Sequence, residues 1–327
     1  MGQLFKLDPL DKLFVLPKPQ DELTDEVWAI IHSLEAAGQL RITCKRDGYC
    51  TTAITTSNRI SLHSRQNTEW TGKFLHIEQD LRDMNIPHDT LVCGESTVTH
   101  NGRDDPNLFG RFALSGTKNS HALQKEFPRT HLSLFDVIIF KGKDVSRLPY
   151  DDRMDILRNL CARSVGHISL IEHFDVPLAA AQQIARERKL EGLVLCDARA
   201  GTSFRLDANW SDPLRPDGRW KWKIKPTTDF VATGWIPSTA ATHFGQVKEL
   251  ILGLYHPITR ELIGFGNAGV GLKKPQRLEL MTARYPLVAE VRYELIRKNN
   301  TLKNPVIERI RDDKLPEECI FPFVRAP

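Results

Sequence analysis

Apolar residues recur at helical spacing in two stretches of the first hundred residues. The first stretch follows Thr24-Asp25-Glu26, which is a typical helix start. Its apolar residues are Val27, Trp28, Ile30, Ile31 and Leu34. Those of the second stretch, which stops before Pro87, are Phe74, Ile77, Leu81 and Met84. We therefore predict two amphipathic helices that pack on a sheet.

Short runs of strand-forming residues surround these helices. They cover residues 40–44, 53–56, 59–63, 90–93, 131–140 and 192–196. Strands and helices are mixed without regular βαβ alternation, so we predict an α+β domain with antiparallel sheets. Two long polar stretches, residues 99–130 and 197–219, interrupt the pattern. We predict loops there, which close over a substrate or decorate the surface.

The pattern changes after Pro226-Thr227-Thr228-Asp229, which we interpret as a hinge. Short strand-like runs follow at residues 230–236, 247–255, 261–265 and 287–296, with a short helix opening at Pro275. This order is typical of a small Greek-key barrel of the oligonucleotide-binding (OB) type. We therefore predict two domains, residues 1–226 and residues 227–327.

Composition narrows the class of protein. Apolar residues make up 41% of the 327 and charged residues 26%, which is typical of a folded globular protein rather than a disordered one. The six cysteines include no C-x-x-C pair, so we expect reduced thiols rather than a four-thiolate zinc site. No apolar run approaches membrane-spanning length. We expect no membrane partner and a monomer in the cytoplasm of a bacterium or of a phage-infected cell.

The net charge of only +4 means that a nucleic-acid surface would have to come from local clusters of basic residues. Such clusters lie at residues 215–225, 273–277 and 292–303. Each could equally be a solvated face.

Lys45-Arg46-Asp47-Gly48 carries the first candidate chemistry. The strand-like run before it delivers Lys45 to a strand end, and Asp47-Gly48 then turns the backbone. A lysine in this position can act as a nucleophile once its amine is neutral, and nearby positive charges favour the neutral form. Arg46, Lys223, Lys225 and a bound metal are the candidates for those charges. Taken alone, such a lysine is more commonly a surface residue before a turn.

Six further short motifs change that interpretation. They are Ser64-Arg65, Gly94-Glu95, Phe135-Asp136, Glu191-Gly192, Lys223-Ile224-Lys225 and Arg311-Asp312-Asp313-Lys314. In this order they resemble the motif series of the covalent nucleotidyltransferases, and the last resembles the C-terminal motif of ATP-dependent DNA ligases. The resemblance covers roughly residues 40 to 320. It implies a nucleotidyltransferase (adenylation) domain followed by an OB-fold domain.

The resemblance implies a reaction in three steps. Lys45 takes AMP from ATP, AMP moves to the 5′-phosphate of a nick in duplex DNA, and the 3′-hydroxyl displaces AMP. Asp47, Lys223 and Lys225 would join Lys45 as catalytic residues. Lys223 and Lys225 alternate along a strand, so both would face one pocket with the α-phosphate between them. The alternative is an edge strand with exposed lysines.

Other residues would bind ATP, Mg²⁺ and DNA by the same resemblance. Thr43 would meet the adenine amino group, Phe135 would stack on the base, and Arg65 would bind the 5′-phosphate. The remaining nucleotide-binding candidates are Glu95, Glu191, Arg311 and Lys314, of which Glu191 and Glu95 would also hold Mg²⁺. Simpler roles stay open: Glu191 paired with Lys189, Glu95 at a strand end, and Phe135 in the core.

One position departs from the family pattern, because Cys50 stands where many ligases have arginine. Arg41, Arg46 and Arg59 are the candidates to replace it. The main rival to a DNA ligase is an RNA ligase or a capping-type nucleotidyltransferase that uses the same lysine. A second alternative is a catalytically silent nucleic-acid-binding protein with the same fold.

Overall fold

The chain divides into two compact units, Met1–Ile224 and Lys225–Pro327. The computed structural model describes residues 7, 13–20, 23–100, 102–127, 129–163, 166–207, 214–297 and 299–321. The division between the units lies two residues before the boundary expected from the sequence. Among the described helices, none combines the length and the apolarity needed to cross a bilayer.

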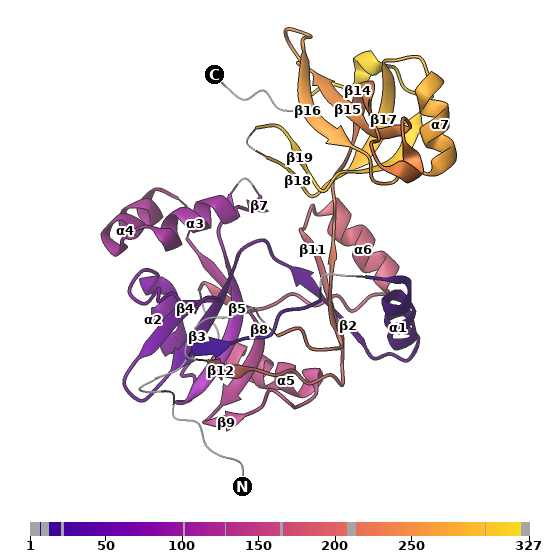
Figure 1. Ribbon diagram of the computed structural model, residues 1–327. Helices are drawn as coiled ribbons and strands as arrows, with labels where there is room; N and C mark the ends of the chain where they lie inside the picture. Colours follow the sequence, from indigo (N-terminus) through magenta and orange to yellow (C-terminus); the bar gives the residue numbers. More distant parts are fainter. Residues whose placement is uncertain are drawn as a thin grey trace. The chain divides into compact units, whose positions relative to one another are not determined.

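A six-stranded sheet forms the centre of the first unit (Figure 1). Its strand order is β10-β8-β5-β3-β4, and β9 pairs with β8 beside this path. The strands are β3 (Tyr49–Thr55), β4 (Ile60–Ser64), β5 (Thr90–Thr97), β8 (His131–Phe140), β9 (Lys143–Asp144) and β10 (Ile168–Leu170). All pairs are antiparallel except β10 with β8. The predicted mixture of helices with mainly antiparallel strands is therefore confirmed.

Four helices surround the largest apolar core of this unit. They are α2 (Leu75–Asp83), α3 (Pro106–Leu114), α4 (Thr117–Glu126) and α5 (Tyr150–Cys161). The core includes Trp70, Phe109, Phe112 and Met154, each at most 2% exposed. The helix predicted before Pro87 is confirmed as α2. The loop predicted at residues 99–130 is wrong, because α3 and α4 lie there after a short hairpin of β6 (Thr99–His100) and β7 (Arg103–Asp104).

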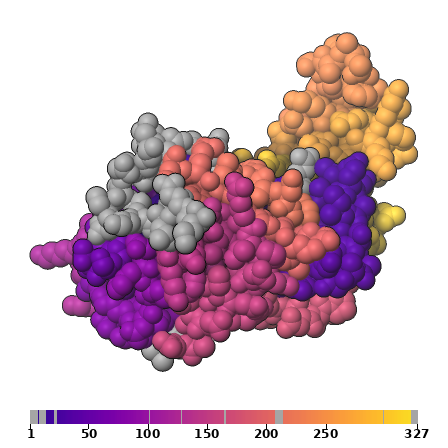
Figure 2. All heavy atoms as spheres, turned by 90° about the horizontal axis from the view of Figure 1, so that it is seen from below, coloured from indigo at the N-terminus to yellow at the C-terminus, as the bar shows by residue number. Residues whose placement is uncertain are grey.

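A second sheet in the same unit has the order β13-β11-β2. Its strands are β2 (Leu40–Lys45), β11 (Gly192–Asp197) and β13 (Arg219–Lys223). The helix predicted after Thr24 is α1 (Asp25–Ala36), and it shares one apolar cluster with α6 (Leu178–Glu187) and with β2, β11 and β13. In Figure 2 the indigo atoms of α1 lie beside the salmon atoms of the chain that ends the unit. Helix α1, from the start of the unit, and strand β13, from its end, therefore pack in the same layer.

The segment before α1 also reaches distant strands. β1 (Leu13–Val15) pairs with β12 (Arg205–Asp207), and Gln20 forms a bridge to Trp220 on β13. Residues 13–20 therefore pair first with β12 and then, at Gln20, with the edge strand of the second sheet. We call them the N-terminal strap.

The second unit contains a five-stranded antiparallel sheet of order β16-β15-β14-β17-β20. Its elements are β14 (Thr227–Pro237), β15 (Val247–Tyr255), β16 (Leu262–Ala268), α7 (Lys274–Thr282), β17 (Leu287–Arg292) and β20 (Val306–Arg311), with a hairpin of β18 (Leu295–Ile296) and β19 (Leu302–Lys303). Buried Phe230 and Phe265 lie in its core. The strand predicted at residues 287–296 is two strands, β17 and β18. The hinge predicted at residues 226–229 is partly wrong, because Thr227 to Asp229 already pair with β17.

Candidate active site

Lys45 lies at the end of β2, next to the centre of the second sheet. Gly192 on β11 is opposite Lys45 on one side and opposite Lys223 on the other. A Cβ atom at Gly192 would lie only 2.0 Å from the carbonyl oxygen of Trp222, so the close strand contact requires glycine here. The two lysines are therefore held side by side across the strand that follows Glu191.

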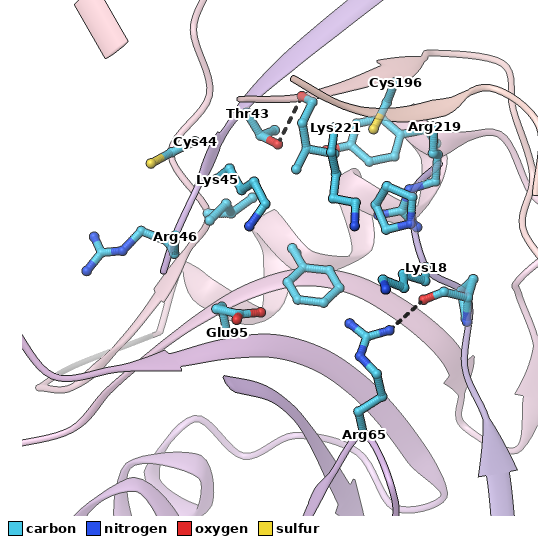
Figure 3. Close-up of a pocket in the computed structure, with 16 residues that line it drawn as sticks. Lys18, Thr43, Cys44, Lys45, Arg46, Arg65, Glu95, Cys196, Arg219 and Lys221 are labelled. Atoms are coloured by element: carbon cyan, nitrogen blue, oxygen red, sulfur yellow. Dashed lines mark hydrogen bonds between the residues drawn. The ribbon is translucent and has the colours of Figure 1, made fainter. Parts of the chain in front are cut away.

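Glu191 lies between the two lysine amines. Its Oε2 accepts a hydrogen bond from Nζ of Lys45, and its Oε1 is 3.7 Å from Nζ of Lys223. The immediate partner of the candidate nucleophile is thus a carboxylate and not a cation. The guanidinium of Arg46 points away from Lys45 (Figure 3) and bonds to Asp104 at 2.6 Å.

A cavity of about 190 Å³ opens beside Lys45, between the two sheets. Figure 3 shows the amines of Lys45 and Lys221 and the guanidinium of Arg65 directed into it from different elements. Phe135 from β8 and Val194 from β11 also line it. Its volume is below the roughly 300–1,000 Å³ of a complete ligand pocket, so it suits a base and sugar better than a whole nucleotide.

The carboxylates near Lys45 repel one another. Burial raises the pKa of Glu95 to about 7, and the negative charges of Glu191 and Asp47 act in the same direction while Lys45 and Arg65 oppose them. Burial raises the pKa of Asp47 to about 6, again with a contribution from Glu191. Crowded carboxylates of this kind match a divalent cation, which would relieve the repulsion.

Replacing Glu95 with glutamine is expected to flatten the dependence of stability on pH. The folded chain retains a proton on Glu95 up to about pH 7, whereas the unfolded chain releases it near the ordinary glutamate pKa of 4.5. Stability from this proton is therefore present in acid and is lost as the pH rises towards 7, by at most about 3 kcal/mol. Urea unfolding of both proteins across this pH range measures the effect. A Glu95→Gln variant whose free energy of unfolding depends on pH as in the wild type would contradict this prediction.

The cavity brings together five residues that the sequence selected. They are Thr43, Lys45, Arg65, Glu95 and Phe135. Glu191 joins them because it forms ion pairs with both Lys45 and Lys223. The negative charge of Glu191 also acts on Asp47. Thr43 is buried and its hydroxyl donates to the carbonyl oxygen of Val194 at 3.4 Å.

The expected pair Lys223 and Lys225 needs correction. β13 ends at Lys223, and Lys225 begins the second unit. Neither residue belongs to the described lining of the cavity. The lysine of β13 that does line it is Lys221, which is only 9% exposed.

Three other cations line the cavity, and of these only Arg46 was considered from the sequence. They are Lys18 from the N-terminal strap, Arg219 from β13, and Arg46 beside the candidate nucleophile. Arg219, Lys221 and Lys223 alternate with Trp220 and Trp222 in the sequence. This alternation could have indicated that Arg219 and Lys221 line the cavity. Lys18 gave no local signal, because the strap reaches the cavity only through the tertiary fold.

The position of Cys50 is opposite Glu95 in the pairing of β3 with β5. The three arginines considered as replacements are each paired with a carboxylate: Arg41 with Asp151, Arg46 with Asp104 and Arg59 with Glu69. Of these three, Arg46 lines the cavity. It is the best candidate by position.

The basic residues of the last motif are held within the second unit. Asp229 accepts from Arg311 at 3.2 Å and from Lys314 at 2.9 Å, and Arg311 also bonds to Asp313. Asp229 lies on β14, the first strand of its sheet. One carboxylate therefore gathers both cations.

Comparison with known proteins identifies relatives across most of the chain. The multifunctional non-homologous end joining protein LigD of Mycolicibacterium smegmatis is 22% identical over 303 residues, which cover 85% of this chain and 36% of that protein. DNA ligase 2 of Methanosarcina mazei is 26% identical over 321 residues, which cover 88% of this chain and 54% of that protein. The chain thus spans about a third to a half of the length of these curated relatives.

The fold agrees with a solved structure. The ligase domain of LigD from M. tuberculosis superimposes with a TM-score of 0.51 at 20% identity, covering 94% of this chain and 98% of that one. In sequence, residues 23–209 match the family described as ATP dependent DNA ligase domain. This match covers more than half of the 327 residues, and the chain therefore belongs to the ATP-dependent DNA ligase domain family.

Proposed function

We propose that this chain is an ATP-dependent DNA ligase that seals nicks between a 5′-phosphate and a 3′-hydroxyl through AMP bound covalently to Lys45. The observation that carries the proposal is the amine of Lys45 at the edge of a cavity lined by an aromatic ring and several cations. A nucleophile, a stacking surface and counter-charges for phosphate are what transfer of AMP requires.

In the first step the Lys45 nitrogen would form a bond to the α-phosphorus of ATP, and the bond to pyrophosphate would break. The amine must lose its proton before attack, and its contact with Glu191 fixes it at the cavity edge. Lys221, on β13 of the same sheet as Lys45, would supply a buried positive charge for the α-phosphate. The base would lie between Phe135 and Val194, with the Thr43 hydroxyl near its amino group.

Mg²⁺ fits the carboxylates near Lys45 but needs the nucleotide as well. Within the described ranges, no three His, Cys, Asp or Glu side chains converge into a complete metal site. Mg²⁺ typically takes one or two carboxylates and completes its shell with water and phosphate oxygens. Glu191 and Glu95 would hold it, and it would polarise the phosphoryl oxygens.

The later steps would take place on nicked duplex DNA. AMP moves from Lys45 to the 5′-phosphate, and the 3′-hydroxyl then attacks that phosphorus and releases AMP. Arg65 would bind the 5′-phosphate, since a guanidinium matches its geometry. Lys223, beside Glu191, would support the charge near Lys45. Lys225, Arg311 and Lys314 are further candidates for binding ATP.

The second unit is proposed to be an OB-fold barrel. A parallel bridge between Val270, just after β16, and Val306, at the start of β20, joins the two edges of the sheet. A Cβ atom at Gly271 would lie 2.1 Å from the carbonyl oxygen of Ile307, so the edges approach closely. Such a closure would place the strands in the cyclic order β14-β15-β16-β20-β17, with α7 between β16 and β17, which supports a Greek-key barrel.

Mass spectrometry after incubation with ATP and Mg²⁺ tests the proposal. We expect one added AMP on Lys45 and sealing of nicked DNA. Parallel reactions with GTP and with nicked RNA distinguish the capping-type and RNA ligase alternatives. Transfer from GTP alone would overturn the proposal.

Binding to nicked DNA is expected to weaken with salt, and Arg65→Ala should reduce that dependence. Each phosphate contact contributes about 0.9 to the slope of log affinity against log salt, so the loss of one contact lowers the slope by about this amount. Fluorescence anisotropy at several salt concentrations measures it. Arg82, an exposed residue of α2, provides the control, and Arg82→Ala should leave the slope unchanged. An unchanged slope for Arg65→Ala would exclude the contact.

A further inference from the structure

A short turn connects Lys45 to the next strand. β2 ends at Lys45 and β3 begins at Tyr49, so residues 46–48 leave the sheet directly after the candidate nucleophile. At Gly48 the turn lies against β5, because a Cβ atom there would be only 2.2 Å from the carbonyl oxygen of Ser96. The position of the Lys45 amine therefore depends on the groups that hold this turn.

Asp104, on β7, binds the turn with both of its carboxylate oxygens. Its Oδ2 accepts a hydrogen bond from the backbone N–H of Asp47 at 3.2 Å, and its Oδ1 accepts one from Nη2 of Arg46 at 2.6 Å. The same Nη2 also donates to the hydroxyl oxygen of Thr97 at 3.0 Å. The side chain of Asp104 is only 15% exposed, and hydrogen bonds to a charged acceptor are stronger than neutral ones. One carboxylate therefore fixes both the backbone and a side chain of the turn.

The segment that carries Asp104 is itself anchored. The next residue, Asp105, caps α3 by accepting a hydrogen bond from the backbone N–H of Leu108 at 2.9 Å. Phe109 of α3 is buried, and the centre of its ring lies 5.1 Å from that of Tyr49, the first residue after the turn. Asp104 therefore reaches the turn from a segment that is joined to the core.

Asp104 does not touch the space in which a nucleotide would lie. Lys45 and Arg46 line the cavity, whereas Asp104 is not part of its described lining. The guanidinium of Arg46 points away from Lys45 (Figure 3), and its bond to Asp104 keeps it there. An effect of Asp104 on AMP transfer would therefore pass through the turn, or act at a distance through its negative charge.

We infer that Asp104 is a positioning residue for the transfer of AMP, because its carboxylate fixes the turn that holds Lys45 at the edge of the cavity. The inference rests on the proposed nucleotide transfer to Lys45. Reacting atoms must lie about 3 to 3.5 Å apart in an aligned geometry, and a displacement of about 1 Å can lower a rate about a hundredfold. Loss of the carboxylate should therefore slow the chemical step more than it weakens ATP binding.

Rapid-quench measurement of AMP attachment tests the inference. Asp104→Ala removes both acceptors and should lower the maximal rate about tenfold to a hundredfold, with little change in the KM for ATP. Asp104→Asn keeps one acceptor oxygen without the charge, so it should recover part of the lost rate. Sealing of a nick that already carries AMP does not use the Lys45 nucleophile, so it should fall less in both variants. If the alanine variant fails to fold, the asparagine variant should still show a smaller loss of the same kind.

Asp151→Ala is the matched control, because it breaks another ion pair of β2. Asp151 accepts hydrogen bonds at 2.9 and 2.7 Å from Arg41, which lies near the other end of that strand. This variant should keep the wild-type rate of AMP attachment even where its unfolding temperature falls.

Equal losses of rate in Asp104→Ala and Asp151→Ala would overturn the inference. So would a raised KM with an unchanged maximal rate in Asp104→Ala, or the absence of any recovery in Asp104→Asn. A wild-type chain that attaches no AMP would instead contradict the proposed function.

Discussion

Lys45→Ala is expected to abolish attachment of AMP to the chain. The amine of Lys45 is the nitrogen that would bond to phosphorus, and alanine supplies no replacement. We expect a loss of at least about 10⁴-fold in the rate of AMP attachment, comparable to the loss of a catalytic nucleophile in other enzymes. Intact-mass measurement after incubation with ATP and Mg²⁺ records the result.

A nick that already carries AMP on its 5′-phosphate provides the control. Sealing of this substrate does not need the nucleophile, so Lys45→Ala should retain part of this activity and a near wild-type unfolding temperature. Continued attachment of AMP by Lys45→Ala would show that another residue is the nucleophile.

Lys221→Ala should reduce AMP transfer more strongly than Lys223→Ala. Lys221 is buried in the cavity wall, where its positive charge would act on the α-phosphate. Removal of one such preorganised group typically costs about 10²- to 10³-fold in rate. The side chain of Lys223 is 44% exposed and paired with Glu191, so we expect a smaller loss. Rapid-quench measurement of AMP transfer separates the two.

Lys225→Ala serves as a further comparison, because Lys221, Lys223 and Lys225 stand at every second position of the sequence. A larger loss for Lys223 than for Lys221 would mean that the cavity wall does not identify the phosphate-binding lysine. The outcome therefore decides whether the strand pairing, which favours Lys221, or the sequence motif, which favours Lys223 and Lys225, identifies the lysine that binds the α-phosphate.

Local signals in the sequence were sufficient for several elements. α1 and α2 were predicted because the caps and the apolar stripe of a helix lie within one short segment. The helices α3 and α4 were missed because polar residues surround them, although Asp105 caps α3 directly before Pro106 and Leu108, Phe109 and Phe112 follow at helical spacing. Loop and helix are difficult to distinguish where the apolar face is so short.

The site was harder to predict where it depends on distant strands. Arg219, Lys221, Lys223 and Lys225 share one alternation, so the sequence cannot say where the strand ends or which side chain meets the cavity. Pairing with β11, which sets Gly192 opposite Lys223 and Val194 opposite Lys221, fixes the answer. Lys18 depends on a contact between residue 20 and residue 220, which no local pattern contains.

The N-terminal strap has a consequence for biosynthesis. The wall of the cavity combines Lys18 with Lys221, which the ribosome adds about two hundred residues later. A nascent chain that has reached only α6 contains Lys45 but lacks the part of the cavity wall that β13 provides. The complete cavity therefore forms late in translation, once β13 has been synthesised and the strap can pair with it.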